Sequence, residues 1–125
     1  MIRDGIKYTI EINGQEYNCP VEVTMSLLDG KWKGIVLWYL KNQTLRFSEL
    51  QRLMPNISQK MLTRELRELE NAGLVFRKVY PEVPPKVEYS LSEYGKTLIP
   101  IIDLICEWGI QHTNKFGNVV EHSSV

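Results

Sequence analysis

The sequence has few cysteines, no net charge and no long apolar run, and each shortage excludes a class of protein. Its 125 residues contain two cysteines, Cys19 and Cys106, which are too few for a disulfide-stapled scaffold and stand at no zinc-ligand spacing. No apolar run approaches the roughly 20 residues that cross a bilayer. Residues 1–6 also lack the apolar core of a secretory signal. We therefore expect a cytoplasmic protein with no membrane partner.

Signatures of catalysis are missing as well. The two histidines, His112 and His122, stand beside no candidate nucleophile and at no metal-ligand spacing, and the chain has no glycine-rich phosphate loop. We expect neither an enzyme nor a bound metal or other cofactor. The composition, 43% hydrophobic and 24% charged, is typical of a globular domain with one hydrophobic core.

The formal net charge is zero, but the charges are unevenly distributed along the chain. Between Lys41 and Lys78 there are eight basic and four acidic residues, which gives this segment a net charge of +4 and leaves −4 for the remainder. A basic middle between acidic flanks favours a single anion-binding face.

Turn and capping residues divide the first half into short elements. Asn13-Gly14 between the alternating segments 7–12 and 15–17 predicts an N-terminal β-hairpin. Pro20 suits the first turn of one helix, and Ser48 is expected to cap another. Helices are predicted over 20–28, 31–41, 49–54 and 59–72, with a very short strand over 45–47.

The second half continues with a hairpin and a long helix. Strands are predicted over 74–80 and 86–91, joined by the proline-stiffened turn 81–85. Ser92 is expected to cap a last helix over 93–115, which Pro100 should kink or offset.

This order predicts a mainly α fold with a small β-wing, the winged helix-turn-helix arrangement. We expect one domain over residues 1–125. Its parts are an N-terminal hairpin extension over 1–18, a winged-helix core over 19–91, a long C-terminal dimerisation helix over 92–115 and a frayed tail over 116–125.

The predicted helix over 59–72 has two chemically different faces. At about 100° per residue, three leucines share one face and basic or polar side chains occupy the opposite one. The leucines are Leu62, Leu66 and Leu69, and the acidic Glu65, Glu68 and Glu70 fall towards the flanks. We assign to DNA contact Ser58, Gln59, Lys60, Thr63, Arg64, Arg67 and Asn71. Arginine can bond guanine and glutamine adenine through two hydrogen bonds, whereas Lys60 and Arg67 suit phosphate. A solvated basic face is the alternative.

The wing offers a second contact with DNA. Lys86 lies beside the stiff turn, and we predict that it touches the DNA backbone or the minor groove. Glu82 at the tip is unfavourable near phosphate, and the prolines fit equally well with a turn that has no role in binding.

Apolar residues cover a wider arc of the last helix than a domain this small can bury. We therefore predict an isologous homodimer, with the first helix joining through Val21, Val23 and Leu27. The last helix is expected to contribute Leu98, Ile101, Ile102, Ile105 and Trp108. Burial of this helix inside its own domain is the alternative.

Five segments carry a resemblance to a known family. They are CPVE at 19–22, GKWK at 30–33, LRFSEL at 45–50, ISQKMLTREL at 57–66 and YPEVPPKVEY at 80–89. Together they resemble the HxlR family of bacterial, MarR-like winged-helix regulators, over most of the chain. The resemblance implies a homodimer that binds pseudo-palindromic double-stranded DNA, usually in response to a chemical or redox signal. It also implies recognition-helix contacts by Gln59, Lys60, Thr63, Arg64 and Arg67.

Cys19 is a candidate redox sensor. It precedes Pro20 at a helix N-terminus, where the partial positive charge favours the thiolate. Some members of the HxlR family sense oxidants or electrophiles through an N-terminal cysteine, and Cys19 matches that Cys-Pro position. A small capping or buried residue is the alternative interpretation. Cys106 lies in an apolar stretch and is predicted to be a core residue.

Two expectations concern partners. A winged-helix interaction module that never binds DNA is the alternative function, and salt-dependent binding to a preferred DNA sequence would distinguish the two. A small-molecule effector, if one exists, is expected to bind between the winged domain and the dimerisation helix.

Overall fold

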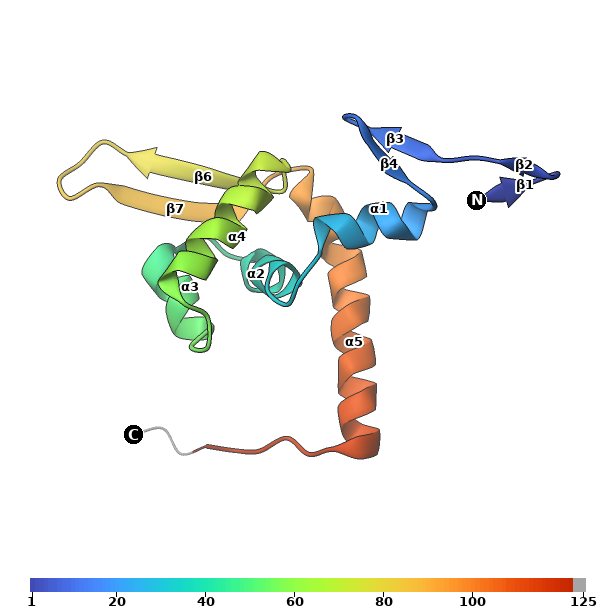
Figure 1. The fold of residues 1–125 in the computed structure, drawn as a ribbon. Helices are drawn as coiled ribbons and strands as arrows, with labels where there is room; N and C mark the ends of the chain where they lie inside the picture. The colour runs from blue at the N-terminus through green and yellow to red at the C-terminus, as the bar shows by residue number, and fades with distance from the viewer. Residues whose placement is uncertain (123–125) are drawn as a thin grey trace.

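The computed structural model describes residues 1–122 (Figure 1). It confirms a mainly α fold with a small β-wing and a long last helix. Within the described residues, no helix combines the length and apolar character that a membrane crossing requires.

Three helices enclose the hydrophobic core: α2 (Lys33–Leu40), α3 (Phe47–Leu53) and α4 (Gln59–Asn71). Apolar residues that recur at spacings of three and four turn one face of α4 inward, as predicted. The largest fully buried side chains are Val36, Leu37, Leu40, Leu50, Leu62, Leu66, Leu69 and Leu74.

A three-stranded antiparallel sheet forms the wing and its base. β6 (Val75–Tyr80) pairs with β7 (Lys86–Leu91), and β7 pairs on its other edge with the short β5 (Leu45–Arg46). The β6–β7 hairpin projects away from the helices (Figure 1). Because β5 runs directly into α3, its pairing with β7 fixes the wing to the helical core.

The last helix begins later than predicted. A 3₁₀ turn, η1 (Gly95–Leu98), precedes α5 (Ile99–Phe116), and Pro100 lies in the first turn of α5. The predicted offset at Pro100 is confirmed, but the predicted start at residue 93 is wrong. Proline has no N–H to donate and its ring would collide with a carbonyl one turn earlier, so an α-helix cannot run through this position without distortion.

Ser92 does cap the turn that leads into η1. Its hydroxyl accepts a hydrogen bond from the Gly95 amide at 2.8 Å and donates one to the Gly73 carbonyl at 2.6 Å. The Ser92 amide donates to the Leu74 carbonyl at 3.1 Å. These bonds hold the end of β7 against the end of α4.

The predicted cap of α3 is also wrong. The helix begins at Phe47, so Ser48 lies inside its first turn and Arg46 takes the N-cap position. The Glu49 carboxylate accepts a hydrogen bond from the Arg46 amide at 2.8 Å, which is one half of a capping box. The glutamate at the third helical position thus sets the start, and no serine cap is needed.

The N-terminal region contains two hairpins where one was predicted, followed by α1 (Pro20–Leu27). β3 (Ile10–Ile12) and β4 (Gln15–Tyr17) form the predicted hairpin, although its first strand begins at Ile10 instead of Lys7. β1 (Ile2–Arg3) and β2 (Ile6–Lys7) form the second. Both hairpins turn on residue pairs with positive φ: Asp4 at 52° and Gly5 at 76°, and Asn13 at 51° and Gly14 at 79°. Asp4-Gly5 is a turn signal of the same kind as Asn13-Gly14, and the sequence-based prediction did not include it.

The predicted tail begins where α5 ends. Residues 117–122 form no regular secondary structure, and residues 123–125 lie outside the described part of the chain.

Gly95 is required where η1 packs against the backbone of residue 74. A Cβ at Gly95 would collide with the Leu74 carbonyl oxygen. We expect Gly95→Ala to lower the free energy of unfolding by about 2 kcal/mol, because either η1 or β6 must shift. Urea denaturation at fixed protein concentration measures this loss.

Gly34→Ala is the matched control, since a Cβ at this position in α2 meets nothing within 4 Å. Alanine in a helix interior should leave stability unchanged or raise it by up to about 1 kcal/mol. If the two substitutions change the free energy of unfolding equally, the close approach of Gly95 to the Leu74 carbonyl does not require glycine.

Candidate nucleic-acid interface

The N-terminus of α4 is capped as the sequence predicts. The Ser58 hydroxyl accepts a hydrogen bond from the Met61 amide at 3.1 Å, and Ile57, just before the cap, is buried. Met61 packs against the same core from the first turn of the helix. The cap and this apolar contact fix where α4 begins and how the chain enters it.

The outward side of α4 carries a row of polar and cationic side chains, here called the recognition stripe. Its members are Gln59, Lys60, Thr63, Arg64 and Arg67, which are all exposed and line one shallow hollow. Asn71 is exposed at the far end of the helix. The predicted division of α4 into an apolar inner and a cationic outer face is therefore confirmed for these residues.

Two members of the recognition stripe already make contacts within α4. The Thr63 hydroxyl donates to the Gln59 carbonyl at 2.8 Å, so the hydroxyl hydrogen is already used. Arg64 donates through Nε to Glu68 Oε1 at 3.2 Å, which uses one of its five N–H donors. The Glu68 contact orients a guanidinium whose side chain is 68% exposed.

A second hollow joins the recognition stripe to the wing. It is lined by Thr63, Arg67, Glu70, Arg77 and Tyr89. Arg77 and Tyr89 are cross-strand partners in the β6–β7 register. Arg77, Lys78 and Lys86 all flank the tip of the wing in the sequence, and Lys86 was predicted as the contact, but it is the exposed Arg77 that shares this hollow with α4.

Lys86 is less available than predicted. Its ammonium lies 4.6 Å from the centre of the Tyr80 ring and 3.5 Å from Glu88 Oε1. A hydrogen bond from Tyr80, followed by the nearby charge of Lys86, lowers the pKa of Glu88 below its usual range. These contacts keep Lys86 half-buried against the wing. Lys78, whose ammonium lies 4.7 Å from the centre of the same Tyr80 ring, and Arg77 are the exposed cations of β6.

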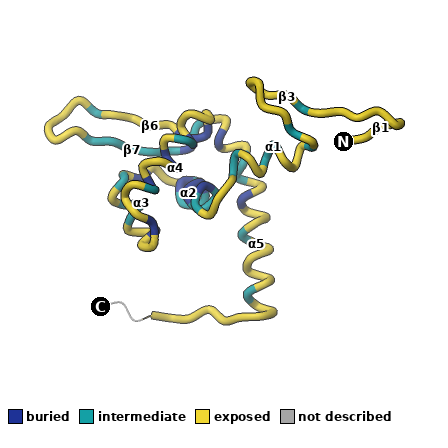
Figure 2. Tube along the Cα trace, in the orientation of Figure 1, coloured by how far each residue is buried: buried dark blue, intermediate teal, exposed yellow. Residues whose placement is uncertain are grey.

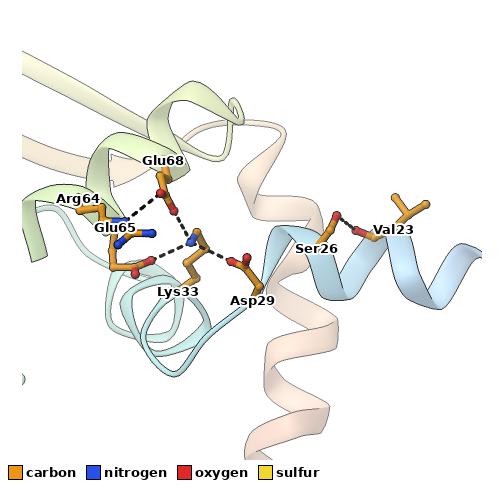
Figure 3. A network of polar contacts seen from close by, with 7 residues as sticks. All are labelled: Val23, Ser26, Asp29, Lys33, Arg64, Glu65 and Glu68. Carbon is orange, nitrogen blue, oxygen red and sulfur yellow. Dashed lines mark hydrogen bonds and ion pairs between the residues drawn. The ribbon is translucent and has the colours of Figure 1, made fainter. Parts of the chain in front are cut away.

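A buried lysine connects α4 to α2, and the sequence reasoning missed it. Lys33, at the start of α2, is only 7% exposed and lies among three carboxylates (Figure 3). Its ammonium donates to Asp29 Oδ1 at 2.9 Å and to Glu68 Oε2 at 2.5 Å. Glu65 Oε2 lies 2.9 Å away as an ion pair, without the alignment of a hydrogen bond.

Glu65 was predicted to lie on a flank of α4, but it is 7% exposed and faces α2. The helical wheel could not reveal this, because only the position of Lys33 on a neighbouring helix makes burial of a carboxylate tolerable.

The carboxylates stabilise the charged form of Lys33. Burial alone would lower its pKa, but the hydrogen bonds to Glu68 and Asp29 and the charge of Glu65 raise it well above the usual range. Hydrogen bonds from Lys33 and then Arg64 lower the pKa of Glu68. Lys33 therefore contributes stability below its ordinary pKa of 10.5, and Glu68 contributes above its ordinary value of 4.5 and loses that contribution as the pH falls.

The structure divides the five side chains predicted for the dimer interface. Ile102 is 5% exposed and packs in its own core, and Leu98 is half-buried against that core, so neither belongs to an exposed face. Ile101, Ile105 and Trp108 are exposed, and Leu104 lies in line with them. We call these four residues the α5 face; they lie over residues 101–108 of α5, most of whose length is exposed (Figure 2).

The two cysteines occupy different settings. Cys19 is half-buried at the N-cap of α1, with extended backbone, and is a free thiol. Cys106 is also half-buried, so the prediction that it is a core residue is wrong. It lies in the wall of an apolar hollow formed by α1, α2 and α5, which Met25, Trp38 and Ile105 also line.

Taken together, a short helix, a capped helix with a cationic outer face and a hairpin placed directly beside it define a winged helix-turn-helix protein. Comparisons with known proteins agree with this class. The HxlR-like helix-turn-helix family matches residues 27–116. The chain therefore belongs to this family.

Curated relatives are named as regulators of transcription. An HTH-type transcriptional regulator of Methanothermobacter thermautotrophicus is 58% identical over 99 residues, which are 79% of this chain and 76% of that protein. The HTH-type transcriptional regulator YtcD of Bacillus subtilis is 54% identical over 101 residues, which are 81% of this chain and 80% of that protein. The chain is accordingly a DNA-binding transcriptional regulator in class.

Solved structures share the fold. The redox regulator HypR in its reduced form aligns with a TM-score of 0.74 and 51% identity, covering 75% of this chain and 93% of that chain. The reduced form of the transcriptional regulator YodB from Bacillus subtilis aligns with a TM-score of 0.65 and 40% identity, covering 74% of this chain and 92% of that chain.

Removal of Lys33 should destabilise the protein strongly. We expect Lys33→Met to lower the free energy of unfolding by about 3 kcal/mol, because Glu65 remains buried without a cation. Adding Glu65→Gln to Lys33→Met should recover at least half of that loss, since the buried charge is gone. Urea denaturation of the three proteins at one concentration tests the pair.

Lys96→Met is the control for this experiment. Lys96 pairs with Glu93 at 2.9 Å on the surface, and both side chains are more than half exposed. Its loss should change stability by less than about 0.5 kcal/mol. If Lys33→Met lowers the free energy of unfolding no more than Lys96→Met does, the buried network does not stabilise the packing of α4.

Proposed function

We propose that this chain is a sequence-specific regulator that binds a pseudo-palindromic operator as a homodimer. The observation that carries the proposal is the recognition stripe, which projects from a capped helix with the cationic wing strand β6 beside it. Cations on this surface would neutralise phosphates and release counterions, and the N-terminal half of α4 would enter the major groove.

Individual roles follow from the chemistry of each side chain. Arg64 is assigned to guanine because its terminal amino groups can donate two parallel hydrogen bonds, and Gln59 can pair with adenine. Lys60 and Arg67 are assigned to phosphates on the two sides of the groove. Ser58 caps the helix and Asn71 lies at its far end, so both are placed at the edges of the contact.

On the wing, Arg77 and Lys78 join Lys86 as candidate contacts to the DNA backbone. Arg77 shares the hollow beside α4 with Arg67, so one phosphate could contact both residues.

Arg64→Ala and Lys60→Ala should have different effects on DNA binding. Arg64→Ala is expected to weaken the binding free energy for operator DNA by about 1–3 kcal/mol per half-site and to relax the preference for one base pair. Lys60→Ala should weaken binding to operator and random DNA alike, and should reduce the slope of log K against log salt by about 1 per protomer. Fluorescence anisotropy with the DNA upstream of its own gene and a scrambled duplex measures both.

Lys115→Ala is the control for charge, because Lys115 lies in the last turn of α5, away from the wing and α4 (Figure 1). It should change neither the sequence preference nor the salt slope. If Arg64→Ala and Lys115→Ala have equal effects, the assignment to α4 fails. A wild-type protein without any sequence preference would favour the interaction module instead.

A homodimer is proposed because the α5 face has no cover within residues 1–122. Its exposed fractions run from 42% for Ile101 to 65% for Leu104 and Trp108. A contiguous apolar row of this kind on a monomer is unfavourable in water, and a two-fold related copy of the same row is its simplest cover.

Sedimentation velocity at micromolar concentration should therefore show a dimer. Ile105→Asp is expected to raise the dissociation constant on the order of 100-fold, because an unpaired carboxylate would be buried in the interface. Leu53→Asp, at an exposed position of α3 outside this face, should leave the dimer intact. A monomeric wild type would contradict the proposal.

We further propose that Cys19 responds to oxidants. HypR is a redox regulator seen in reduced and oxidised forms, and YodB is seen in reduced and diamide-treated forms. In this chain Cys19 is a half-buried free thiol at the N-cap of α1. Peroxide would convert the thiolate to a sulfenic acid, with hydroxide as the leaving group.

Cys19→Ser tests this role, with Cys106→Ser as the matched control. Peroxide should weaken operator binding by wild type and Cys106→Ser, and should leave Cys19→Ser unaffected. The comparison is made by anisotropy before and after treatment, and reduction with a thiol should restore binding. A Cys19→Ser protein that still responds would exclude Cys19 as the sensor.

A small-molecule effector would fit best in the apolar hollow lined by α1, α2 and α5, at the joint between the winged core and the α5 face. Asp29 follows α1 and belongs to the Lys33 network, so a shift at this joint would reach α4.

A further inference from the structure

The N-terminal arm, residues 1–18, lies outside the segment that matches the family and has no role in the helix-turn-helix. It leaves the N-terminal end of α1 and extends to the side of α5 opposite to the wing (Figure 1). The winged core of the same protomer therefore lies on one side of α5, and its arm lies on the other.

The arm contacts the rest of its own protomer at α1, where β4 lies close and the Asn18 amide donates to Glu22 Oε2 at 2.8 Å. Its four strands pair only with one another, in the two hairpins β1–β2 and β3–β4. Several large apolar side chains are exposed along it: Ile2 at 76%, Ile6 at 56%, Tyr8 at 45% and Ile12 at 42%. Isolated two-stranded hairpins are marginal in water, so an arm of this kind needs a surface to pack against.

The β3–β4 hairpin is two-sided. Cross-strand partners share a face, and the register pairs Ile10 with Tyr17 and Ile12 with Gln15. This places Ile10, Ile12 and Tyr17 on one face. Glu11 and Glu16 are paired on the other face, where their like charges weaken the isolated hairpin. Ile10 and Tyr17 are half-buried and Ile12 is exposed, so the part of the apolar face that is free to dock is the end at Ile12.

The charge and the apolar side chains of the arm favour packing on a protein surface over binding to DNA. Residues 1–18 contain two basic and three acidic side chains, a net charge of −1, which is unsuitable for DNA. Its apolar side chains continue into α1, where Val21 and Met25 are 66% and 53% exposed. Met25 in turn lines a hollow with Ile105 of α5. The exposed apolar surface thus runs from the arm to the α5 face.

We propose that the two arms are exchanged in the homodimer, each packing its apolar side on the partner subunit. This inference rests on the proposed dimer. Because Ile105 of the α5 face and Met25 of α1 line one hollow, a partner that packs on the α5 face also lies beside α1, from which the arm extends. Two-fold symmetry then places the partner's arm on this protomer in the same way. The arm then adds to the contact area of a dimer whose α5 face alone is a single row of side chains.

Photo-crosslinking of mixed-isotope dimers tests the exchange. Protein with p-benzoylphenylalanine in place of Ile6 is prepared with ¹⁴N and with ¹⁵N, and the two are unfolded together, refolded and irradiated. Arm exchange predicts crosslinked peptide pairs of mixed isotope, in which the arm is joined to a second protomer. Pairs of a single isotope only would show that the arm packs on its own protomer, and would overturn the proposal.

Sedimentation of the same sample separates the two hypotheses. A dimer without mixed-isotope pairs rejects arm exchange and leaves the proposed dimer standing. A monomer rejects the proposed dimer and the exchange with it.

Substitution of the arm gives a quantitative test. Ile2→Ser combined with Ile12→Ser is expected to raise the dimer dissociation constant on the order of 100-fold, because each arm loses two apolar contacts. Glu11→Gln, on the acidic face, is the matched control and should leave the constant within a factor of about three. Circular dichroism at high protein concentration checks that the core of each variant is folded. An unchanged dissociation constant in a folded double variant would overturn the proposal.

Discussion

Burial of the leucine row of α4 against α2 is the contact on which the rest of the structure depends. Leu62, Leu66 and Leu69 are at most 2% exposed, and they meet side chains of α2 such as Val36 and Leu37, which are fully buried. Each fully buried leucine contributes about 2 kcal/mol. Once the leucine face of α4 is buried, the opposite face must point outward. The same contact therefore stabilises the fold and sets the direction of the recognition stripe.

The Lys33 network adds a constraint that the leucines cannot supply. Apolar side chains tolerate a small rotation of α4 about its axis, whereas an ammonium among three carboxylates does not, since its contacts depend on position and direction. Glu68 accepts from Lys33 with one oxygen and from Arg64 with the other, so the cation beneath α4 and a cation of the recognition stripe share a carboxylate. Asp29 extends the network to the joint after α1.

The sequence predicted the features that depend on local signals, and it failed where contacts between distant segments decide. The Ser58 cap, the two faces of α4 and the β6–β7 hairpin follow from residues close in sequence. Burial of Glu65 depends on Lys33, which lies 32 residues earlier in the chain. Pro100 could have predicted the late start of α5. Its effect on the helix was expected, but the proline was placed in the interior of a helix over 93–115 and not in the first turn. Ile102 was assigned to an interface because a wheel shows an apolar arc without showing which part of it the domain itself covers.

The central claim is that a dimer presents α4 to the major groove twice. Methylation interference at guanine N7 on the operator tests it most directly, because this modification blocks the major-groove edge that an arginine contacts. We predict interference at two symmetric half-sites, with centres separated by roughly one helical turn or a multiple of it. The interference should be lost in both halves with Arg64→Ala. Interference at one site only, or a pattern that Arg64→Ala leaves unchanged, would contradict a dimer that reads both half-sites through α4.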